Sequence, residues 1–329
     1  MVKVLMKGNE AIAAAAIKGG CRYFFGYPIT PQNELPEYMS REMPKAGGVF
    51  LQAESEIAAI NMVYGASCAG ARVMTSSSSP GIALKQEGIS FLASTELPCV
   101  IINISRAGPG IGGIQPGQAD YYQSTRGGGN GDYNVIVYAP STLQEAVELT
   151  VDAFEVADYY RNPVMILGDG MIGQMMEPVE LRDPIKRDIP PKDWALTGTK
   201  GKRDRNRILS VALQPDDLEK NNLALKAKYN TIRENEVRYE AYNLEDADII
   251  LVAYGTIARV VQSAIDDLEA LGIKAGYIRP ITVWPFPYSA FDLISDKTQC
   301  VLSVEMSFGQ MVDDVLIGVK GRFPVDVCS

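Results

Sequence analysis

Four polar residues stand just after short apolar runs, where the ends of strands would present them for chemistry. Thr30 lies in residues 26–31 (GYPITP), whose two prolines fix a loop behind the preceding apolar run. Glu54 and Glu56 follow the next apolar run, and Arg106 follows a later one. A carboxylate can hold or move a proton, and a guanidinium can bind a carboxylate substrate through paired hydrogen bonds. An ordinary proline turn is the alternative interpretation of residues 26–31.

Alternating helices and short apolar strands position these residues. The spacing predicts helices over residues 8–17, 32–43, 55–69, 82–94 and 142–157, and strands over residues 21–25, 49–52, 73–75, 99–105, 135–138 and 163–167. This order predicts an α/β fold with a parallel sheet covered on both faces, whose ligands bind beyond the carboxyl ends of the strands. Thr30, the two glutamates and Arg106 are therefore expected to converge on one crevice.

The residue composition changes along the chain and divides it into three parts. Residues 1–185 hold the pattern described above. Residues 186–245 are rich in proline and charge, with two helical patterns rich in lysine and glutamate, and they predict a linker with helices. Residues 246–329 predict a second, smaller α/β domain, with strands over 248–254, 274–278 and 299–304, a helix over 257–271 and a rigid turn at 284–287 (WPFP).

Residues 107–133 interrupt the alternating pattern with two glycine-rich runs. The segment is too rich in glycine for a core and too long for a plain connection. Loops of this kind are usually lids or binding surfaces, so we expect it to serve the site. A surface excursion without a function is the alternative.

The composition excludes several classes of function. The 329 residues carry a formal net charge of -9, which argues against a nucleic-acid partner, because phosphate binding needs a basic stripe. Histidine is absent, which excludes Ser-His-Asp and Cys-His nucleophiles and histidine metal sites. The five cysteines show no C-x-x-C spacing, so we interpret them as buried small apolar residues rather than disulfides or metal ligands. No metal-binding residue is predicted.

The sequence also favours a location inside the cell. No apolar run reaches the roughly 18 residues of a membrane-spanning helix. The first eight residues are too short and too charged for a signal peptide. We therefore predict a cytoplasmic protein without a membrane partner.

Five segments, taken together and in order, resemble a known family. They are residues 26–31 (GYPITP), 53–56 (AESE), 78–81 (SSPG), 105–109 (SRAGP) and 284–287 (WPFP). Over essentially the whole chain they resemble the alpha subunit of 2-oxoacid:ferredoxin oxidoreductases, first the 2-oxoisovalerate (3-methyl-2-oxobutanoate) type and second the 2-oxoglutarate type. The resemblance implies a thiamine diphosphate pyrimidine-binding-type domain followed by a transketolase C-terminal-like domain. Chains of this family usually continue past the point where this one ends, so we expect the second domain to be truncated.

The resemblance implies an activity that one chain cannot perform alone. The expected reaction is oxidative decarboxylation of a 2-oxoacid to acyl-CoA and CO2, with electrons passing to ferredoxin. The expected partners are beta, gamma and ferredoxin-like subunits. Thiamine diphosphate would be shared with the beta subunit, with Mg2+ and the iron–sulfur clusters on partner subunits. A non-catalytic assembly subunit of the same fold is an alternative, and a nucleotide-binding protein using the glycines at 127–131 is a weaker one, because no clear helix follows them.

The resemblance also assigns roles to individual residues. It places Glu56 against N1′ of the aminopyrimidine, where a carboxylate favours the imino tautomer, whose nitrogen then takes the C2 proton. Glu54 competes for this role, and the alternative for either glutamate is that its charge only complements the start of a helix. Pro28 and Ile29 would contact the cofactor. Thr30 and Arg106 would bind the substrate carboxylate; the alternative for Arg106 is that it only pins the glycine-rich loop.

Two further features bear on whether the chain binds a metal ion and on which 2-oxoacid is its substrate. Gly168-Asp169-Gly170 imitates the start of a thiamine–magnesium motif, but the Asn-Asn pair at 221–222 lies far beyond the roughly 25–30 residues that this motif requires, so we interpret Asp169 as a turn residue. A 2-oxoglutarate substrate would need a second cation for its distal carboxylate. Besides Arg106 the chain offers only Arg126 near the predicted site, which favours 2-oxoisovalerate.

Overall fold

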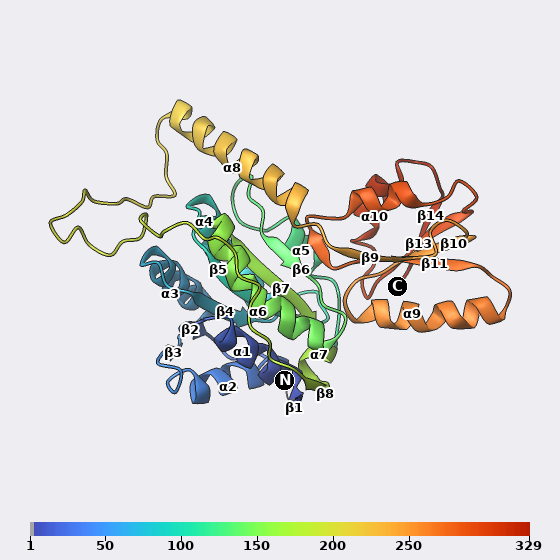
Figure 1. Cartoon of the computed structure of the whole chain (residues 1–329), viewed down its shortest axis with the longest axis horizontal. Helices are drawn as coiled ribbons and strands as arrows, with labels where there is room; N and C mark the ends of the chain where they lie inside the picture. Colours follow the sequence, from blue (N-terminus) through green and yellow to red (C-terminus); the bar gives the residue numbers. More distant parts are fainter. Residues whose placement is uncertain (1–2) are drawn as a thin grey trace.

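A computed structural model describes residues 3–329 of the chain (Figure 1). Six strands of its first sheet run parallel: β2 (Tyr23–Gly26), β3 (Val49–Gln52), β4 (Val73–Ser77), β5 (Cys99–Ser105), β6 (Ile136–Tyr138) and β7 (Pro163–Asp169). The main helices around them are α1 (Gly8–Lys18), α2 (Glu34–Glu42), α3 (Glu56–Cys68), α4 (Ser79–Ser94) and α6 (Leu143–Tyr160). The predicted α/β fold with a parallel sheet is confirmed.

The order of the strands determines where a ligand site lies. The parallel strands are arranged as β6-β7-β5-β4-β2-β3. The chain runs outward from β2 to β3, returns past β2 to β4, and continues to β5 in the opposite direction. Because crossover connections are right-handed, α3 and α4 cover one face and α2 covers the other. The helices therefore diverge outside the carboxyl ends of β2 and β4, where open α/β sheets bind ligands.

Burial within the sheet follows the apolar runs. Every residue of β4, β5 and β7 is buried, as expected for central strands covered on both faces. Strand β3 lies at the edge and is mostly exposed. Helix α1 packs against α2 and α6 with five of its alanines buried, which lets these helices approach closely. The site at the strand ends therefore rests on a rigid base.

The other edge of this sheet is closed from far along the sequence. Strand β12 (Thr282–Trp284) pairs antiparallel with β6. The sequence indicated only a rigid turn at residues 284–287, because a three-residue strand gives no periodicity to read. The first sheet thus takes a strand from beyond residue 246, where the sequence pattern changes.

The second sheet lies on the right of Figure 1 and is smaller. Its order is β14 (Val325–Cys328), β13 (Cys300–Val304), β10 (Ile249–Val252), β11 (Ala275–Pro280) and β9 (Tyr239–Tyr242). Only β9 runs antiparallel to its neighbour. The 3-10 helix η1 (Tyr288–Leu293) and helices α9 (Gly255–Ala270) and α10 (Val312–Val319) accompany it. The predicted second α/β unit therefore forms, with β9 contributed by the predicted linker.

The predicted linker contains one helix, α8 (Pro215–Asn235), where two helical patterns were expected. Residues 180–214 form no helix or strand, and Figure 1 shows them as a loop projecting from the body. Prolines at 184, 190 and 191 explain this, since they remove backbone donors and disfavour helical neighbours. The short strands β1 (Val4–Lys7) and β8 (Met176–Val179) pair with each other.

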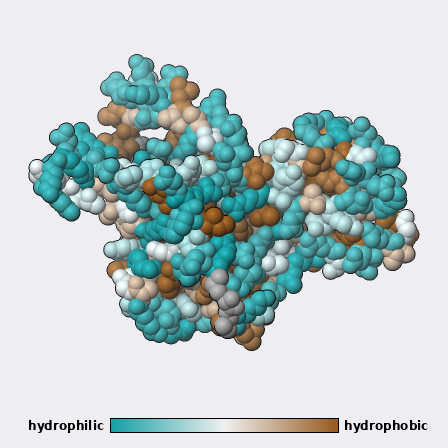
Figure 2. Space-filling model, viewed as in Figure 1, coloured by the Kyte–Doolittle hydropathy of each residue, from teal (hydrophilic) through white to brown (hydrophobic). Residues whose placement is uncertain are grey.

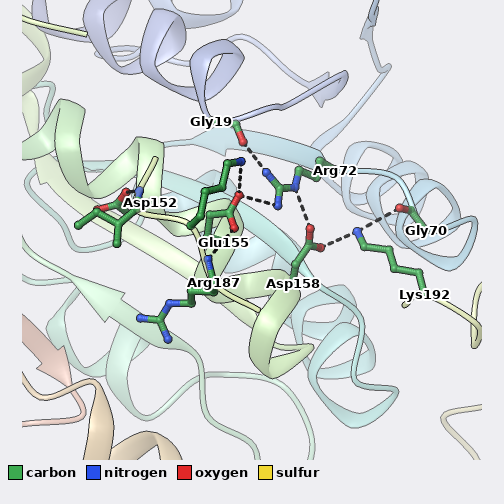
Figure 3. Close-up of polar contacts among 10 residues, drawn as sticks. Gly19, Gly70, Arg72, Asp152, Glu155, Asp158, Arg187 and Lys192 are labelled. Carbon is green, nitrogen blue, oxygen red and sulfur yellow. Dashed lines mark hydrogen bonds and ion pairs between the residues drawn. The ribbon is translucent and has the colours of Figure 1, made fainter. Parts of the chain in front are cut away.

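A cluster of charged side chains ties the start of this loop to α6 (Figure 3). Arg72 donates to Asp158 at 2.7 Å and to Glu155 at 3.0 Å. Lys192, on the loop, donates to Asp158 at 2.6 Å, and Lys186 donates to Glu155 at 2.9 Å. Both carboxylates are buried, and each is paired with two cations, as buried charges require.

All five cysteines are free; Cys21, Cys68 and Cys99 are buried as expected, whereas Cys300 is half-buried and Cys328 exposed. Figure 2 shows apolar surface in the region of α8 and the loop before it. On α8 itself, Leu218 and Leu223 are exposed. Within residues 3–329, no helix has the length and apolar character needed to cross a membrane.

Candidate functional site

The site lies where the loops after β2, β3, β4 and β5 meet at the carboxyl edge of the first sheet. Glu56 is the first residue of α3, and Ser55 caps this helix by accepting from the backbone N–H of Ala58 at 3.1 Å. Glu56 is 7% exposed, whereas Glu54 is exposed to solvent. The positive end of the helix dipole favours a carboxylate at this position. Burial thus separates the two glutamates that the sequence left as competitors.

The carboxylate of Glu56 accepts no hydrogen bond from any residue in the described range 3–329. It lies against the start of α4 instead. A Cβ atom placed on Gly81 would stand 2.7 Å from Glu56 Oε1 and 2.1 Å from Ser77 Oγ, so only glycine allows this approach. The hydroxyls of Ser77 and Ser78 are also buried, with no hydrogen-bond partner among the described residues. The Glu56 carboxylate and the buried Ser77 hydroxyl thus both lie beside Gly81 without a hydrogen-bond partner among the described residues.

Lys85, which the sequence interpretation missed, lies beside Glu56. Its side chain is fully buried on α4, and its Nζ donates to the backbone carbonyl of Glu56 at 3.4 Å. Burial lowers the pKa of Lys85 to about 8, and the negative charge of Glu56 offsets part of that effect. The available signal was a lysine four residues after Gly81 on the face of α4 that packs on α3.

Arg106 and Thr30 meet as expected, but through the backbone. Arg106 Nη1 donates to the carbonyl of Thr30 at 2.8 Å, and Nη2 donates to the carbonyl of Ile111 at 2.6 Å. Arg106 thus pins the glycine-rich loop, which was the alternative interpretation. Its Nε is buried without a partner among the described residues, so one donor remains. The side chain of Thr30 and Pro28 are exposed, and Ile29 is half-buried.

The glycine-rich segment 107–133 is held in place by a buried carboxylate, Asp120. Ser79 Oγ and Asn103 Nδ2 each donate to Asp120 Oδ2 at 2.8 Å, and the backbone N–H of Arg106 donates to Ser79 Oγ at 2.9 Å. Burial raises the pKa of Asp120, against the effect of its hydrogen bonds. The segment also contains a short helix, α5 (Tyr121–Thr125). It is therefore a fixed wall beside the start of α4.

Two other sequence candidates lie elsewhere. Arg126 pairs with Asp314 at 2.7 Å, at the junction with the second sheet. Asp169 caps the short helix α7 (Gly170–Gln174) by accepting from the N–H groups of Met171 and Ile172, and it also accepts from the hydroxyl of Thr256. Asp169 is therefore a helix cap between the two sheets, where the sequence suggested a turn residue.

Comparison with known proteins identifies the family. The family model described as pyruvate flavodoxin/ferredoxin oxidoreductase, thiamine diphosphate-binding, matches residues 14–243. The chain belongs to this family. A second model, pyruvate:ferredoxin oxidoreductase core domain II, matches residues 247–329. The predicted membership of the 2-oxoacid:ferredoxin oxidoreductase family is confirmed: the chain is a subunit of a thiamine diphosphate-dependent enzyme that works as a hetero-oligomer.

Individual relatives of this oxidoreductase chain cover most of its length. It is 51% identical to the ketoisovalerate oxidoreductase subunit VorB of Methanothermobacter marburgensis, over 96% of this chain and 89% of the relative. It is 39% identical to the 2-oxoglutarate synthase subunit KorA of Methanocaldococcus jannaschii, over 94% of this chain and 90% of the relative. The 2-oxoglutarate:ferredoxin oxidoreductase of Magnetococcus marinus, solved with 2-oxoglutarate, coenzyme A and succinyl-CoA, has a similar structure, with a TM-score of 0.88 and 26% identity. That likeness covers 100% of this chain and 63% of the longer one.

Proposed function

We propose that this chain supplies the pyrimidine side of the thiamine diphosphate site in an enzyme that converts 2-oxoisovalerate, coenzyme A and ferredoxin to acyl-CoA, CO2 and reduced ferredoxin. The observation that carries the proposal is the buried carboxylate of Glu56, which lies at the carboxyl edge of the sheet without a hydrogen-bond donor among residues 3–329. A fold that builds a helix start around such a group leaves it for a ligand.

The residues around Glu56 fit an aminopyrimidine ring. The ring carries nitrogen donors and acceptors on its edges. The groups available to it are the Glu56 carboxylate, which accepts no hydrogen bond within residues 3–329, and the buried hydroxyls of Ser77 and Ser78. Thiamine diphosphate supplies the electron sink that decarboxylation of a 2-oxoacid needs. Glu56 holds the proton at N1′, and Pro28 and Ile29 contact the cofactor and exclude water from it.

The substrate carboxylate is assigned to Thr30 and Arg106. The unpaired Nε of Arg106 supports this role, since a buried guanidinium N–H needs an acceptor. Two loop carbonyls already occupy the other end of the guanidinium, which fixes its orientation before the substrate binds. Arg106 therefore combines both roles that the sequence allowed, anion binding and loop anchoring.

The identity of the 2-oxoacid rests on two supports. The chain is 51% identical to the ketoisovalerate subunit and 39% identical to the 2-oxoglutarate subunit. Arg126, the second cation that 2-oxoglutarate would need, is held by Asp314 and stacks on Tyr121 and Tyr122. An assay of the reconstituted complex with equal concentrations of 2-oxoisovalerate, 2-oxoglutarate and pyruvate should favour the first. A preference for 2-oxoglutarate that Arg126→Ala abolishes would overturn this choice.

The proposed enzyme is a complex that contains further subunits. We infer beta, gamma and ferredoxin-like partners that carry Mg2+ and the iron–sulfur clusters, in the cytoplasm. Within residues 3–329, no group of three or more acidic or cysteine residues is placed to hold a metal ion. The exposed Leu218 and Leu223 on α8 support a protein contact there. The isolated chain should show no turnover.

Substitution of Glu56 by glutamine tests the catalytic assignment. Glu56→Gln keeps the shape of the side chain and removes the charge that holds the proton at N1′, so exchange of the C2 proton of bound cofactor should fall at least about a hundredfold in the assembled complex. Glu54→Gln, two residues earlier and exposed, is the matched control and should exchange at the wild-type rate. Exchange lost in Glu54→Gln and retained in Glu56→Gln would reverse the assignment.

The same pair of variants tests the alternative of a non-catalytic assembly subunit. Such a subunit would leave C2 exchange unaffected by either substitution, provided that both variants assemble with their partners. Assembly is checked by the mass of the purified complex.

A further inference from the structure

Residues 207–213 lead from the projecting loop into the outer end of α8 (Figure 1). They form neither helix nor strand, and they take part in no backbone–backbone hydrogen bond within residues 3–329. Leu209, Val211 and Leu213 are 65%, 60% and 86% exposed. Apolar side chains at every second position, beside free backbone donors and acceptors, are the pattern of a strand whose neighbour is missing.

The outer end of α8 is equally uncovered. Every residue of 215–224 is exposed, and Leu225 is the first buried residue of the helix. Leu218 and Leu223 add apolar surface to this end. Helices in proteins take most of their stability from packing, and this end of α8 has little of it within the described chain. We therefore expect residues 207–224 to be covered by another protein chain.

Charges of opposite sign flank the apolar residues 208–213. Five basic residues and one acidic residue precede them: Lys200, Lys202, Arg203, Arg205 and Arg207, with Asp204. Three acidic residues follow them at the start of α8: Asp216, Asp217 and Glu219. None of these residues forms an ion pair within the described range 3–329. An apolar centre with a basic side and an acidic side is complementary to a second copy of itself, turned through a two-fold axis.

We propose that residues 200–223 form an interface between two copies of this chain, related by a two-fold axis that passes beside Val211. Antiparallel pairing about this axis places Val211 against Val211 of the other copy and Leu209 against its Leu213. The same order brings Arg205 toward Asp217 of the other copy. The free backbone groups of each copy then supply the donors and acceptors that the other lacks. A different subunit is the other candidate, and the mirrored order of the charges favours the second copy.

The first test is sedimentation of the purified 329-residue chain, which should be a dimer. Val211→Asp sets two like charges against each other at the axis, so the dissociation constant of the dimer should rise at least about a hundredfold. Val260→Asp is the matched control, because Val260 is also 60% exposed but lies on α9. It should sediment as the wild type does. A monomeric wild type, or an unchanged constant in Val211→Asp, would overturn the inference.

Charge reversal tests whether the two flanks face each other. Arg203→Glu with Arg205→Asp should weaken the dimer, and so should Asp217→Arg with Glu219→Arg. All four substitutions in one chain should restore it, because each reversed flank then meets a reversed partner. A different subunit on this surface would gain nothing from the combination. Failure of the fourfold variant to bind better than the two double variants would therefore contradict the second copy.

A cross-link tests the interface in the assembled complex. Val211→Cys is made together with Cys328→Ser, since Cys328 is exposed and could cross-link by itself. Opposed residues of antiparallel strands have Cα atoms about 4.5–5.5 Å apart, within reach of a disulfide. A thiol oxidant such as diamide should link two copies of the chain, whereas Val260→Cys in the same background should stay unlinked. Linkage of Val211→Cys to a different subunit, or no linkage between two copies, would refute the proposal without touching the role of Glu56.

Discussion

Glu56 and Glu305 are both buried carboxylates near the start of a helix, and the two sheets treat them in opposite ways. Glu305 follows β13 and accepts five hydrogen bonds, from the hydroxyls of Ser303 and Ser307 and from three backbone N–H groups ahead of α10. Glu56 follows β3 and accepts none within residues 3–329. A carboxylate that the fold satisfies completely has nothing left for a ligand. The difference distinguishes an acid that holds a loop from an acid kept for chemistry.

The same substitution in both glutamates should give the largest contrast in stability. Glu305→Gln replaces a charged acceptor with an amide whose NH2 group faces backbone donors, so the free energy of unfolding should fall by about 3–5 kcal/mol. Glu56→Gln removes no hydrogen bond and leaves only Lys85 without its counter-charge. Because Lys85, with a pKa of about 8, gives up its proton readily, that loss should stay below about 2 kcal/mol. Urea unfolding of the two variants measures this contrast, and equal losses would contradict it.

Substitution of Arg106 is expected to have the next largest effect, on catalysis rather than on stability. Arg106→Lys replaces a planar fork with a point charge that cannot reach the carbonyls of Thr30 and Ile111 and a substrate carboxylate together. Losing one charge-assisted hydrogen bond should lower kcat/KM by an amount equivalent to about 1.5–3 kcal/mol. The dissociation constant of thiamine diphosphate should change much less. An unchanged kcat/KM with a weakened cofactor affinity would move Arg106 to the cofactor side of the site.

The smallest effects are expected from Gly→Ala substitutions on two facing helices, at Gly81 on α4 and Gly65 on α3. These two substitutions form a closely matched pair. Gly81→Ala would place a methyl group 2.7 Å from Glu56 Oε1, so it should slow C2 exchange by displacing the carboxylate and cost about 1–3 kcal/mol of stability. Gly65→Ala, on the far part of α3, meets no atom of the described residues within 4 Å and should stabilise the protein by about 0.5–1 kcal/mol. Thermal unfolding and the exchange rate separate them. If Gly81→Ala changed neither the stability nor the exchange rate, the Glu56 carboxylate would be free to move.

Sequence patterns predicted the first sheet well because its strands are buried runs. The strand at 99–105 was predicted with its observed bounds, since a run in which five of seven residues are apolar is typical of a central strand. Strands β12 and β9 were missed, because three or four residues with partners distant in the chain leave no local period. The expectation of a second helix in the linker was wrong. Prolines and charged residues there replace the apolar spacing that a packed helix needs.

At the site, the sequence indicated the right loops but not their contacts. It left Glu54 and Glu56 undecided, because two glutamates at a helix start look alike until burial separates them. It did not single out Lys85, since a lysine in a helix is usually at the surface. It overestimated the freedom of Arg126, because nothing local indicates that Asp314, far along the chain, will hold it.

Strand β12 also sets an order of events during synthesis of the chain. The edge of β6 ends at Tyr138, and the strand that covers it ends at Trp284, so nearly half of the chain separates the two. At a translation rate of about 5–20 residues per second, this edge leaves the ribosome on the order of ten seconds before its cover exists. An uncovered strand edge is a template for pairing with other nascent chains. While the first sheet is being translated, the uncovered edge of β6 is therefore a place where nascent chains can pair with one another.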